Sequence, residues 1–174
     1  MAAAALLLTG TFGTGKTITA DAVGLQLEAA SVPHAVIDLD EIRRMWPPPT
    51  ADRSGTSVDY RNVQSLAANY LDAGADRLVL AGVCENRADR RRYEAAVAVP
   101  LVVCRLLASP AVITRRLRDR HLDEPDELAW HLKRAPELDA ILNTTRVADA
   151  EVATDSKTPL DVAVEIIRLI GWGT

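Results

Sequence analysis

The 174-residue chain contains little cysteine and little lysine, and it has no long hydrophobic run. Its two cysteines, Cys84 and Cys104, form no CxxC pair and have no pair of histidines nearby, which argues against a zinc site or a disulfide framework. We expect both to be small buried hydrophobic residues in a reducing compartment. No apolar run reaches the roughly 20 residues that cross a membrane, and residues 1–8 lack the basic start of a secretion signal. The sequence therefore predicts a cytoplasmic protein that does not act at a membrane.

The chain also lacks a strong charge of either sign, since 20 basic residues stand against 24 acidic ones and leave a net charge of −4. This balance argues against a general role in binding nucleic acids, whose phosphates demand clustered positive charge. About 48% of the residues are apolar and 25% are charged, as is typical of a globular protein. A chain of this length can bury a core without a metal or a disulfide, so we predict one domain over residues 1–174, either monomeric or homodimeric.

Short apolar runs alternate with longer stretches in which apolar residues recur at helical spacing. Strands are expected at residues 3–8, 35–39, 78–83, 101–107 and 151–154. Helices are expected at residues 18–30, from 40, at 59–74 with Asp59 as the cap, at 88–97, 110–120 and 159–170, with 121–143 partly helical. Three prolines at residues 47–49 end the second helix, and a polar loop follows. Strands that alternate with helices predict an α/β fold with a parallel sheet covered on both faces.

A phosphate-binding loop is the clearest motif in the chain. Residues 10–17 fit the pattern G-x-x-x-x-G-K-[ST] and lie between the first strand and the first helix. Glycines let backbone N–H groups face phosphate oxygens, and the helix adds the positive end of its dipole. Lys16, one of only three lysines, is expected to contact the β- and γ-phosphates, and the Thr17 hydroxyl to bind Mg²⁺. The predicted nucleotide contacts are Gly10, Thr11, Phe12, Gly13, Thr14, Gly15, Lys16 and Thr17.

Two carboxylates, Asp38 and Asp40, lie at the end of the second expected strand. The carboxyl ends of the strands in a doubly wound sheet form the ligand crevice, where one acid can support hydrated Mg²⁺ while the other orients and deprotonates a hydroxyl. Alternatively, Asp40 and Glu41 cap and stabilise the first turn of the next helix. No lysine lies in the N-K-x-D context by which GTPases read guanine, and the D-x-x-G at residues 52–55 lies in a proline-rich loop instead of at a strand end.

The phosphate loop, combined with the D-x-D-x-x-R element at residues 38–43, resembles the small P-loop kinases. These include adenylylsulfate kinase, shikimate kinase, gluconate kinase and chloramphenicol phosphotransferase. The resemblance implies a three-layer α/β/α P-loop NTPase fold with a five-stranded parallel sheet and a helical lid at about residues 121–143. It also implies that Asp38 supports Mg²⁺, that Asp40 contacts or activates the acceptor hydroxyl, and that Arg43 holds a polar or anionic group of the acceptor.

The same resemblance assigns roles to residues near the lid. Arg116 and Arg120 end the helix that leads into the lid and are expected to close on the nucleotide phosphates, with Arg134 as a partner from the far side. Phosphoryl transfer gathers negative charge on oxygens, which guanidinium groups can stabilise while a closed lid excludes water. Thr158 lies in the polar turn after the fifth strand, where the backbone is expected to contact adenine.

The acceptor pocket is expected within residues 40–75, where the sequence contains no motif that identifies the acceptor. The run of residues 45–49, which includes Trp46, matches none of the named kinases and leaves the acceptor unidentified. Glu85 follows the third strand and either faces the crevice or begins the next helix. No Asp ends that strand to serve Mg²⁺, which favours the kinase interpretation over a motor-type ATPase. Trp130 either contacts substrate or lid, or anchors its helix to the body.

These patterns predict an ATP- and Mg²⁺-dependent phosphotransferase that acts on a hydroxyl or phosphate of a small-molecule acceptor. The expected catalytic residues are Lys16, Asp40, Arg116 and Arg120, the expected acceptor contacts are Asp40, Arg43, Trp46, Glu85 and Arg134, and the metal is expected at Thr17 and Asp38. The alternative is a nucleotide-binding switch or regulatory ATPase that acts through a protein partner. In either case we expect a cleft that is locally positive although the chain as a whole is not.

Overall fold

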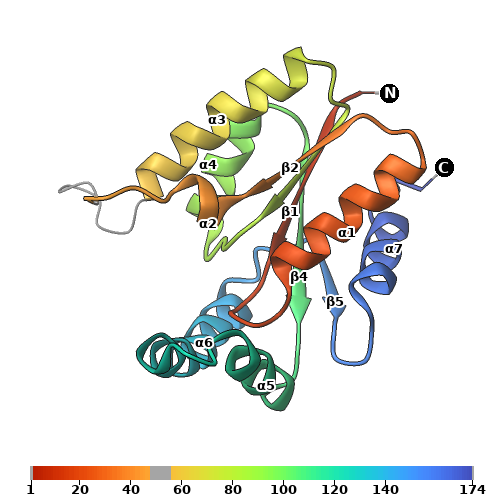
Figure 1. Ribbon diagram of the computed structural model, residues 1–174. Coiled ribbons are helices and arrows are strands. Elements are labelled where there is room, and N and C mark those ends of the chain that lie inside the picture. Colours follow the sequence, from red (N-terminus) through yellow and green to blue (C-terminus); the bar gives the residue numbers. More distant parts are fainter. Residues whose placement is uncertain (1, 48–55, 174) are drawn as a thin grey trace.

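The structure is a computed structural model that describes residues 2–47 and 56–173 (Figure 1). Its strands are β1 (Ala4–Thr9), β2 (His34–Asp38), β3 (Arg77–Ala81), β4 (Leu101–Leu107) and β5 (Ala150–Ala153). Its helices are α1 (Lys16–Ala29), α2 (Leu39–Ile42), α3 (Thr56–Asp72), α4 (Arg87–Val97), α5 (Pro110–Arg120), α6 (Pro125–Thr145) and α7 (Pro159–Leu169). The D-x-x-G at residues 52–55 and most of the polar loop lie outside the described residues.

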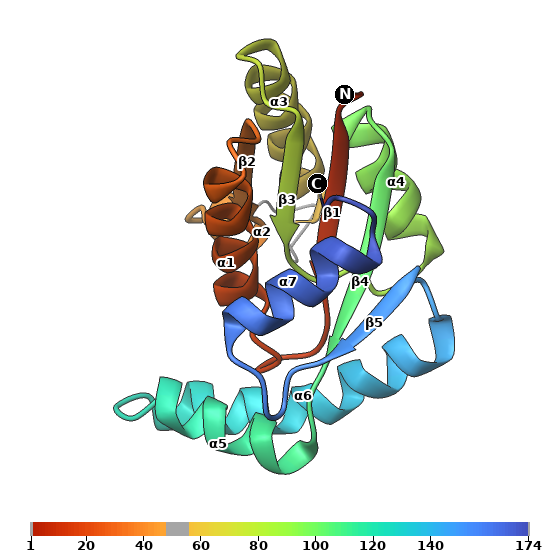
Figure 2. The same ribbon diagram turned by 90° about the vertical axis from the view of Figure 1, so that its right-hand side faces the viewer.

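The five strands form one parallel sheet in the order β2-β3-β1-β4-β5. β1 lies at its centre, where Leu7 is opposite Leu80 of β3 and Val103 of β4. Helices α3 and α4 cover one face of the sheet, and α1 and α7 lie side by side on the other (Figures 1 and 2). The three-layer α/β/α fold with a five-stranded parallel sheet is thereby confirmed.

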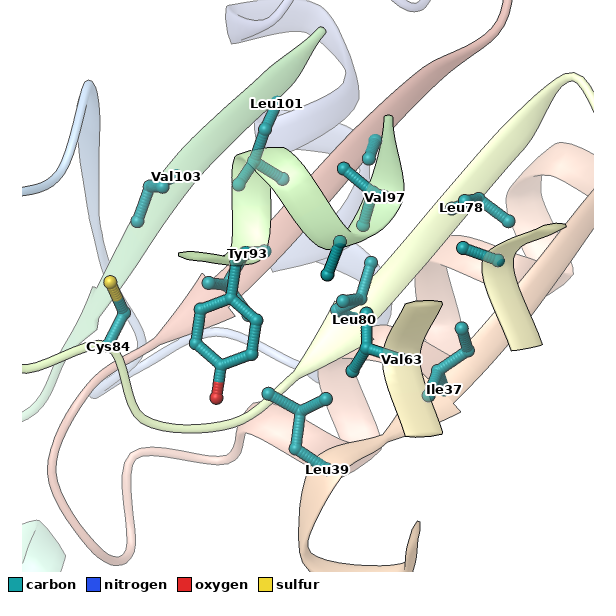
Figure 3. Packing of buried hydrophobic residues seen from close by; sticks show 14 of the residues in the cluster. Ile37, Leu39, Val63, Leu78, Leu80, Cys84, Tyr93, Val97, Leu101 and Val103 are labelled. Carbon is teal, nitrogen blue, oxygen red and sulfur yellow. The ribbon is translucent and has the colours of Figure 1, made fainter. Parts of the chain in front are cut away.

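Each face of the sheet has its own hydrophobic core, which explains why β1 is continuously apolar. On one face Leu7 and Leu80 pack with Val63 of α3 and Tyr93 of α4 (Figure 3). On the other face the neighbouring side chain Leu6 packs against α1 and α7. Successive residues of a strand point to opposite faces, so a strand buried on both sides needs apolar residues throughout.

A third, smaller core joins α5 and α6 to the phosphate loop at the carboxyl edge of the sheet. Ile113, Leu117 and Ala135 are buried there, and Phe12 packs against them. Both helices lie beyond the carboxyl ends of the strands in Figures 1 and 2. Arg105 of β4, which is 4% exposed, secures α6 through a hydrogen bond of 2.7 Å to Asp139 and one of 3.0 Å to Asn143.

Two local expectations need correction. Asp59 does not cap α3, because that helix begins at residue 56 and places Asp59 in its first turn. The cap of α2 is Asp38 instead of Asp40, since the Asp38 carboxylate accepts the backbone N–H of Asp40. The segment 121–143 is partly helical as expected, since it is helix from residue 125 onward; this helix continues to 145 with Pro136 inside it and packs on the third core. No helix of the described residues is long and apolar enough to cross a membrane.

Candidate active site

The phosphate loop connects the carboxyl end of β1 to the amino end of α1. Gly10 has a φ of 147°, and a Cβ there would lie 2.7 Å from the carbonyl oxygen of Leu106. Gly15 caps α1 with a φ of 93°, and the first turn of α1 contains no acidic residue. Only glycine adopts such backbone angles at little cost, so the loop can turn tightly and leave its N–H groups facing outward. These groups and the positive end of the helix dipole make the loop suited to an anion.

The side chain of Lys16 is held by the backbone of the phosphate loop. Its Nζ donates to the carbonyl oxygens of Gly10 and Thr11, each at 3.0 Å. Burial lowers the pKa of Lys16 to about 8, although the carboxylates of Asp40 and Asp38 act in the opposite direction. An ammonium group that is costly to desolvate gains strongly from a negatively charged ligand.

Thr17 and Asp38 lie together at the start of the crevice. The Thr17 hydroxyl donates to Asp38 Oδ2 at 2.7 Å, while Asp38 Oδ1 accepts the N–H of Asp40 at 2.8 Å. The capping and metal interpretations of these acids are thus compatible, since one oxygen of Asp38 caps α2 and the other faces Thr17. No cluster of three or more histidine, cysteine or acidic side chains suited to a metal occurs in residues 2–47 and 56–173. A metal here would need oxygens from a phosphate or from water, as Mg²⁺ at phosphoryl-transfer sites usually does.

One cavity of about 540 Å³ unites most of the residues expected from the motifs. The phosphate loop from Phe12 to Thr17 lines it, with Asp40 from α2 and with Arg116 and Arg120 from α5. The polar turn that was expected near adenine contributes Lys157 and Pro159 to the lining. Further lining residues that no local motif marks are Ile18, Thr19, Leu117, Thr154 and Val162.

Arg116 and Arg120 lie one turn apart on α5 but have different surroundings. Arg116 donates to the carbonyl oxygen of Gly13 at 3.2 Å, to the Thr154 hydroxyl at 2.9 Å and to the Thr154 carbonyl oxygen at 2.9 Å. Arg120 makes no hydrogen bond or ion pair with any described residue, and its charge contributes to lowering the pKa of Lys16, after burial. Arg116 therefore supports the backbone of the loop, whereas Arg120 is the α5 cation available to a ligand.

Thr158 does not line this cavity, although Lys157 and Pro159 on either side of it do. Its hydroxyl accepts the N–H of Asp161, and the Asp161 side chain accepts the N–H of Thr158, which is a capping box at the start of α7. A threonine followed by an acid three residues later is a sequence pattern that predicts a capping box, so the capping role of Thr158 could have been predicted from the sequence.

Arg43 lies between two carboxylates on the acceptor side. It hydrogen-bonds to Asp40 and lies 3.5 Å from Asp59, which is 2% exposed. Burial alone would lower the pKa of Arg43, but Asp40 and Asp59 outweigh it and raise the pKa above its usual value. The sequence did not reveal Asp59 as a partner, because it is distant in the chain and belongs to no motif. Trp46, which was expected to shape the pocket, is 90% exposed and lines no part of the cavity.

Glu85 and Arg134 meet each other, away from the nucleotide cavity. Glu85 Oε1 lies 3.4 Å from Arg134, which also pairs with Glu137 at 3.2 Å. Asn86 caps α4, so Glu85 precedes that helix and does not begin it. The pair connects the end of β3 to α6.

Trp130 contacts the phosphate loop. Its ring centroid lies 5.4 Å from that of Phe12 in an edge-on arrangement, and His131 packs edge-on to Phe12 at 4.8 Å. Phe12 in turn lies 5.8 Å from the Lys16 ammonium. Trp130 therefore joins α6 to the loop while 53% of the residue remains exposed.

No model of a protein family and no curated protein sequence matches the chain. Solved structures do match over nearly its whole length. A tunicamycin resistance protein of Deinococcus radiodurans is 18% identical with a TM-score of 0.68, covering 97% of this chain and 96% of its own. A gluconokinase of Sinorhizobium meliloti is 16% identical with a TM-score of 0.63, covering 97% and 92%. The APS kinase of Mycobacterium tuberculosis, in complex with AMPPNP and APS, is 21% identical with a TM-score of 0.60, covering 98% of both chains. At these identities the likeness shows the fold, which is that of the small P-loop kinases.

Proposed function

We propose that the protein is an ATP- and Mg²⁺-dependent phosphotransferase that moves the γ-phosphoryl group to a hydroxyl or phosphate of a small-molecule acceptor. The observation that carries this proposal is that Lys16, Thr17, Asp40 and Arg120 line a single cavity. An acid in the same cavity as the phosphate-binding lysine can accept the proton of an acceptor hydroxyl, which a site that only binds a nucleotide does not require. The fold, shared with small-molecule kinases, supports the same class of reaction.

The nucleotide phosphates bind over the loop at residues 10–17, against its N–H groups and the amino end of α1. On nucleotide binding, the Lys16 ammonium would leave the carbonyl oxygens of Gly10 and Thr11 and bind phosphate oxygens instead. The ion pair with phosphate would offset the cost of burying the ammonium charge. Arg120 lines the same cavity and stabilises negative charge on the transferred group. The structurally similar APS kinase of Mycobacterium tuberculosis was solved in complex with AMPPNP, which supports ATP as the phosphoryl donor.

Thr17 and Asp38 would hold Mg²⁺, because a hydroxyl and a carboxylate oxygen 2.7 Å apart are the hard donors that this ion prefers. When bound, the ion neutralises charge on the phosphates and orients them. Glu85 is less suited to this duty, since its carboxylate pairs with Arg134.

Asp40 is proposed as the residue that prepares the acceptor. As an acceptor hydroxyl oxygen bonds to the γ-phosphorus, the bond from that phosphorus to the bridging oxygen breaks and ADP leaves. The hydroxyl proton passes to Asp40, which lines the cavity and is 61% exposed at its side chain. Arg43 orients the Asp40 carboxylate through its hydrogen bond. Closure of residues 121–143 over the site would exclude water.

The test is whether the γ-phosphoryl group goes to a metabolite. The purified protein is incubated with Mg²⁺ and ATP labelled at the γ-position, with and without a deproteinised small-molecule extract of cultured bacteria. We expect a new labelled compound and stoichiometric ADP only when the extract is present. Release of free phosphate at the same rate in water alone would contradict the proposal and favour the regulatory ATPase. Nucleotide binding without turnover in either condition would favour the switch.

A further inference from the structure

A second cavity, of about 280 Å³, lies between α5 and α6 and shares no lining residue with the nucleotide cavity. The two helices lie side by side beyond the carboxyl ends of the strands (Figures 1 and 2). Ile113 of α5 and Ala135 of α6 are its buried lining residues, and Leu132, prolines and further alanines make the rest of the lining mostly apolar. Small-molecule sites start at roughly 300 Å³, so this cavity has room for one ring with a short side chain.

Asp139 is the charged residue among those that line this α5–α6 cavity, and Thr114 and Asn143 are the other polar ones. Its carboxylate accepts the guanidinium of Arg105 at 2.7 Å with one oxygen and the amide of Asn143 at 3.0 Å with the other. A carboxylate can accept about four hydrogen bonds, so a ligand that brings N–H donors can still bind to Asp139.

Arg105 does not cancel the negative charge at this cavity. It lies 2.7 Å from Asp139 and 3.5 Å from Glu151, and none of the three makes a further ion pair with the residues that the structure describes. One positive charge therefore serves two carboxylates, which favours a cationic ligand and disfavours an anionic one. The guanidinium is 4% exposed and also bonds Asn143, so both polar groups are held in place before a ligand arrives.

The α5–α6 cavity adjoins the phosphate loop from the side opposite the nucleotide cavity. The hydroxyl of Thr11 donates to the carbonyl oxygen of Ala135 at 2.6 Å. A Cβ at Gly13 would lie 3.3 Å from the carbonyl oxygen of Ile113. The buried residues of the cavity thus separate it from the loop, and a ligand there does not occupy the place of the nucleotide phosphates.

We propose that the α5–α6 cavity is a second ligand site, which binds a small molecule that joins one apolar ring to a protonated amine. The ring lies against Ile113 and Leu132, and the ammonium group donates to Asp139. This site is separate from the proposed phosphotransferase reaction, and its existence does not depend on that reaction.

The ligand class is tested with 2-phenylethylamine, which is protonated at pH 7, by following the amide chemical shifts of the ¹⁵N-labelled protein. We expect saturable shifts in the millimolar range. 3-Phenylpropionate, which carries a carboxylate on the same ring and spacer, should bind at least ten times more weakly. Equal or tighter binding of 3-phenylpropionate, or no saturable shift with the amine, would overturn the inference.

The place of binding is tested by Ala140→Phe, which fills the cavity from an exposed lining position of α6. The dissociation constant for the amine should rise at least tenfold. Ala129→Phe is the matched control, because Ala129 is exposed on the same helix and does not line the cavity, and it should leave binding unchanged. Asp139→Asn should lower the preference for the amine over the neutral 2-phenylethanol about tenfold. An unchanged affinity in Ala140→Phe, or an unchanged preference in Asp139→Asn, would contradict this placement.

Separation from the nucleotide cavity is tested by repeating the amine titration with saturating AMPPNP and Mg²⁺. The dissociation constant for the amine should change less than threefold. A constant that rises in proportion to the AMPPNP concentration would place the amine in the nucleotide cavity and overturn the inference. A protein that bound the amine but not AMPPNP would contradict the kinase proposal and leave this inference standing.

Discussion

Lys16 and Arg120, on the nucleotide side of the cavity, have no carboxylate bonded to them among the described residues, whereas Arg43 and Arg134, on the acceptor side, each lie between two carboxylates. Both sets lie at the same edge of one sheet. The positive charges of the first set can pair with the phosphates of a nucleotide. The burial of Lys16 disfavours its charged form, so that an anionic ligand would stabilise it. The second set is complete in the free protein, so its charges serve to position one another. Among the residues that the structure describes, the cations without a bonded carboxylate in this cavity are therefore on the nucleotide side.

The largest effect should come from removing the cation at the loop. Lys16→Ala should lower kcat/KM for phosphoryl transfer by about a thousandfold or more, because Lys157, the other lysine that lines the cavity, is already paired with Glu165. The melting temperature of the free protein should not change, because the substitution removes a buried charge whose desolvation destabilises the folded state. Transfer is measured with labelled ATP and unfolding by calorimetry.

Lys133→Ala is the matched control for this variant. Lys133 is exposed on α6 and makes no hydrogen bond or ion pair with the described residues. Its removal should alter neither activity nor stability. Retention of more than a tenth of the activity in Lys16→Ala would contradict the assignment of the nucleotide side.

The next largest effect should come from the acid at the boundary between the two sides. Asp40→Asn should lower kcat about a hundredfold to a thousandfold, because the amide cannot accept the proton of the acceptor hydroxyl. The dissociation constant for ATP should change less than threefold, since the loop and Lys16 remain. Equilibrium binding and single-turnover transfer separate these two quantities.

Glu41→Gln serves as the control, because Glu41 is exposed beside Asp40 and pairs only with Arg44 among the described residues. That variant should keep full activity. An Asp40→Asn protein with the wild-type rate would remove Asp40 from the mechanism.

The two arginines of α5 allow the comparison to be repeated within one helix. Arg120→Ala should lower kcat tenfold to a hundredfold with an unchanged melting temperature, because Arg120 has no partner to lose among the described residues. Arg116→Ala should lower the melting temperature by about 4–8 °C, equivalent to ~2 kcal/mol for a protein of this size, because its hydrogen bonds to Gly13 and Thr154 are lost.

Arg118→Ala is the control for both, since Arg118 is exposed on the same helix and makes no hydrogen bond or ion pair with described residues. If Arg120→Ala destabilised the protein and Arg116→Ala did not, the roles given to the two arginines would be reversed.

The nucleotide side was readable from the sequence because its parts are contiguous. Eight adjacent residues specify the turn, the helix start, the lysine and the hydroxyl, so a local pattern predicts a local geometry. The alternating apolar runs likewise predicted the sheet, whose strands are buried on both faces. Arg116 and Arg120 were indicated by the resemblance to the small P-loop kinases, and both line the cavity.

The acceptor side was not readable, because its contacts join separate elements. Arg43 acquires its second carboxylate from Asp59 in α3, and Glu85 acquires Arg134 from α6. Arg116 is bound by carbonyl oxygens of Gly13 and Thr154, and backbone acceptors leave no trace in side-chain patterns. A pattern of residue types shows that charge is present, but only the fold shows which charges are already paired.

The smallest expected effect is a dependence of ATP affinity on pH, specific to the nucleotide side. The pKa of Lys16 in the free protein is lowered from 10.5 to about 8, mainly by burial. Raising the pH from 7 to 9 should therefore weaken ATP binding by up to about tenfold, because the deprotonated amine must regain its proton to pair with phosphate. Calorimetry in buffers of different ionisation enthalpy should detect proton uptake on binding near pH 8.

Lys16→Arg isolates this effect, because a guanidinium stays protonated throughout the range and should make ATP affinity independent of pH between 7.5 and 9. The stability of the free protein should change in the opposite direction to ATP affinity. The unfolded chain binds more protons than the folded one between about pH 8 and 10.5, so the free energy of unfolding should rise with pH there in the wild type and not in Lys16→Arg. A wild-type affinity that stays constant up to pH 9 would mean that Lys16 is paired before ATP arrives, and the difference between the two sides of the cavity would disappear.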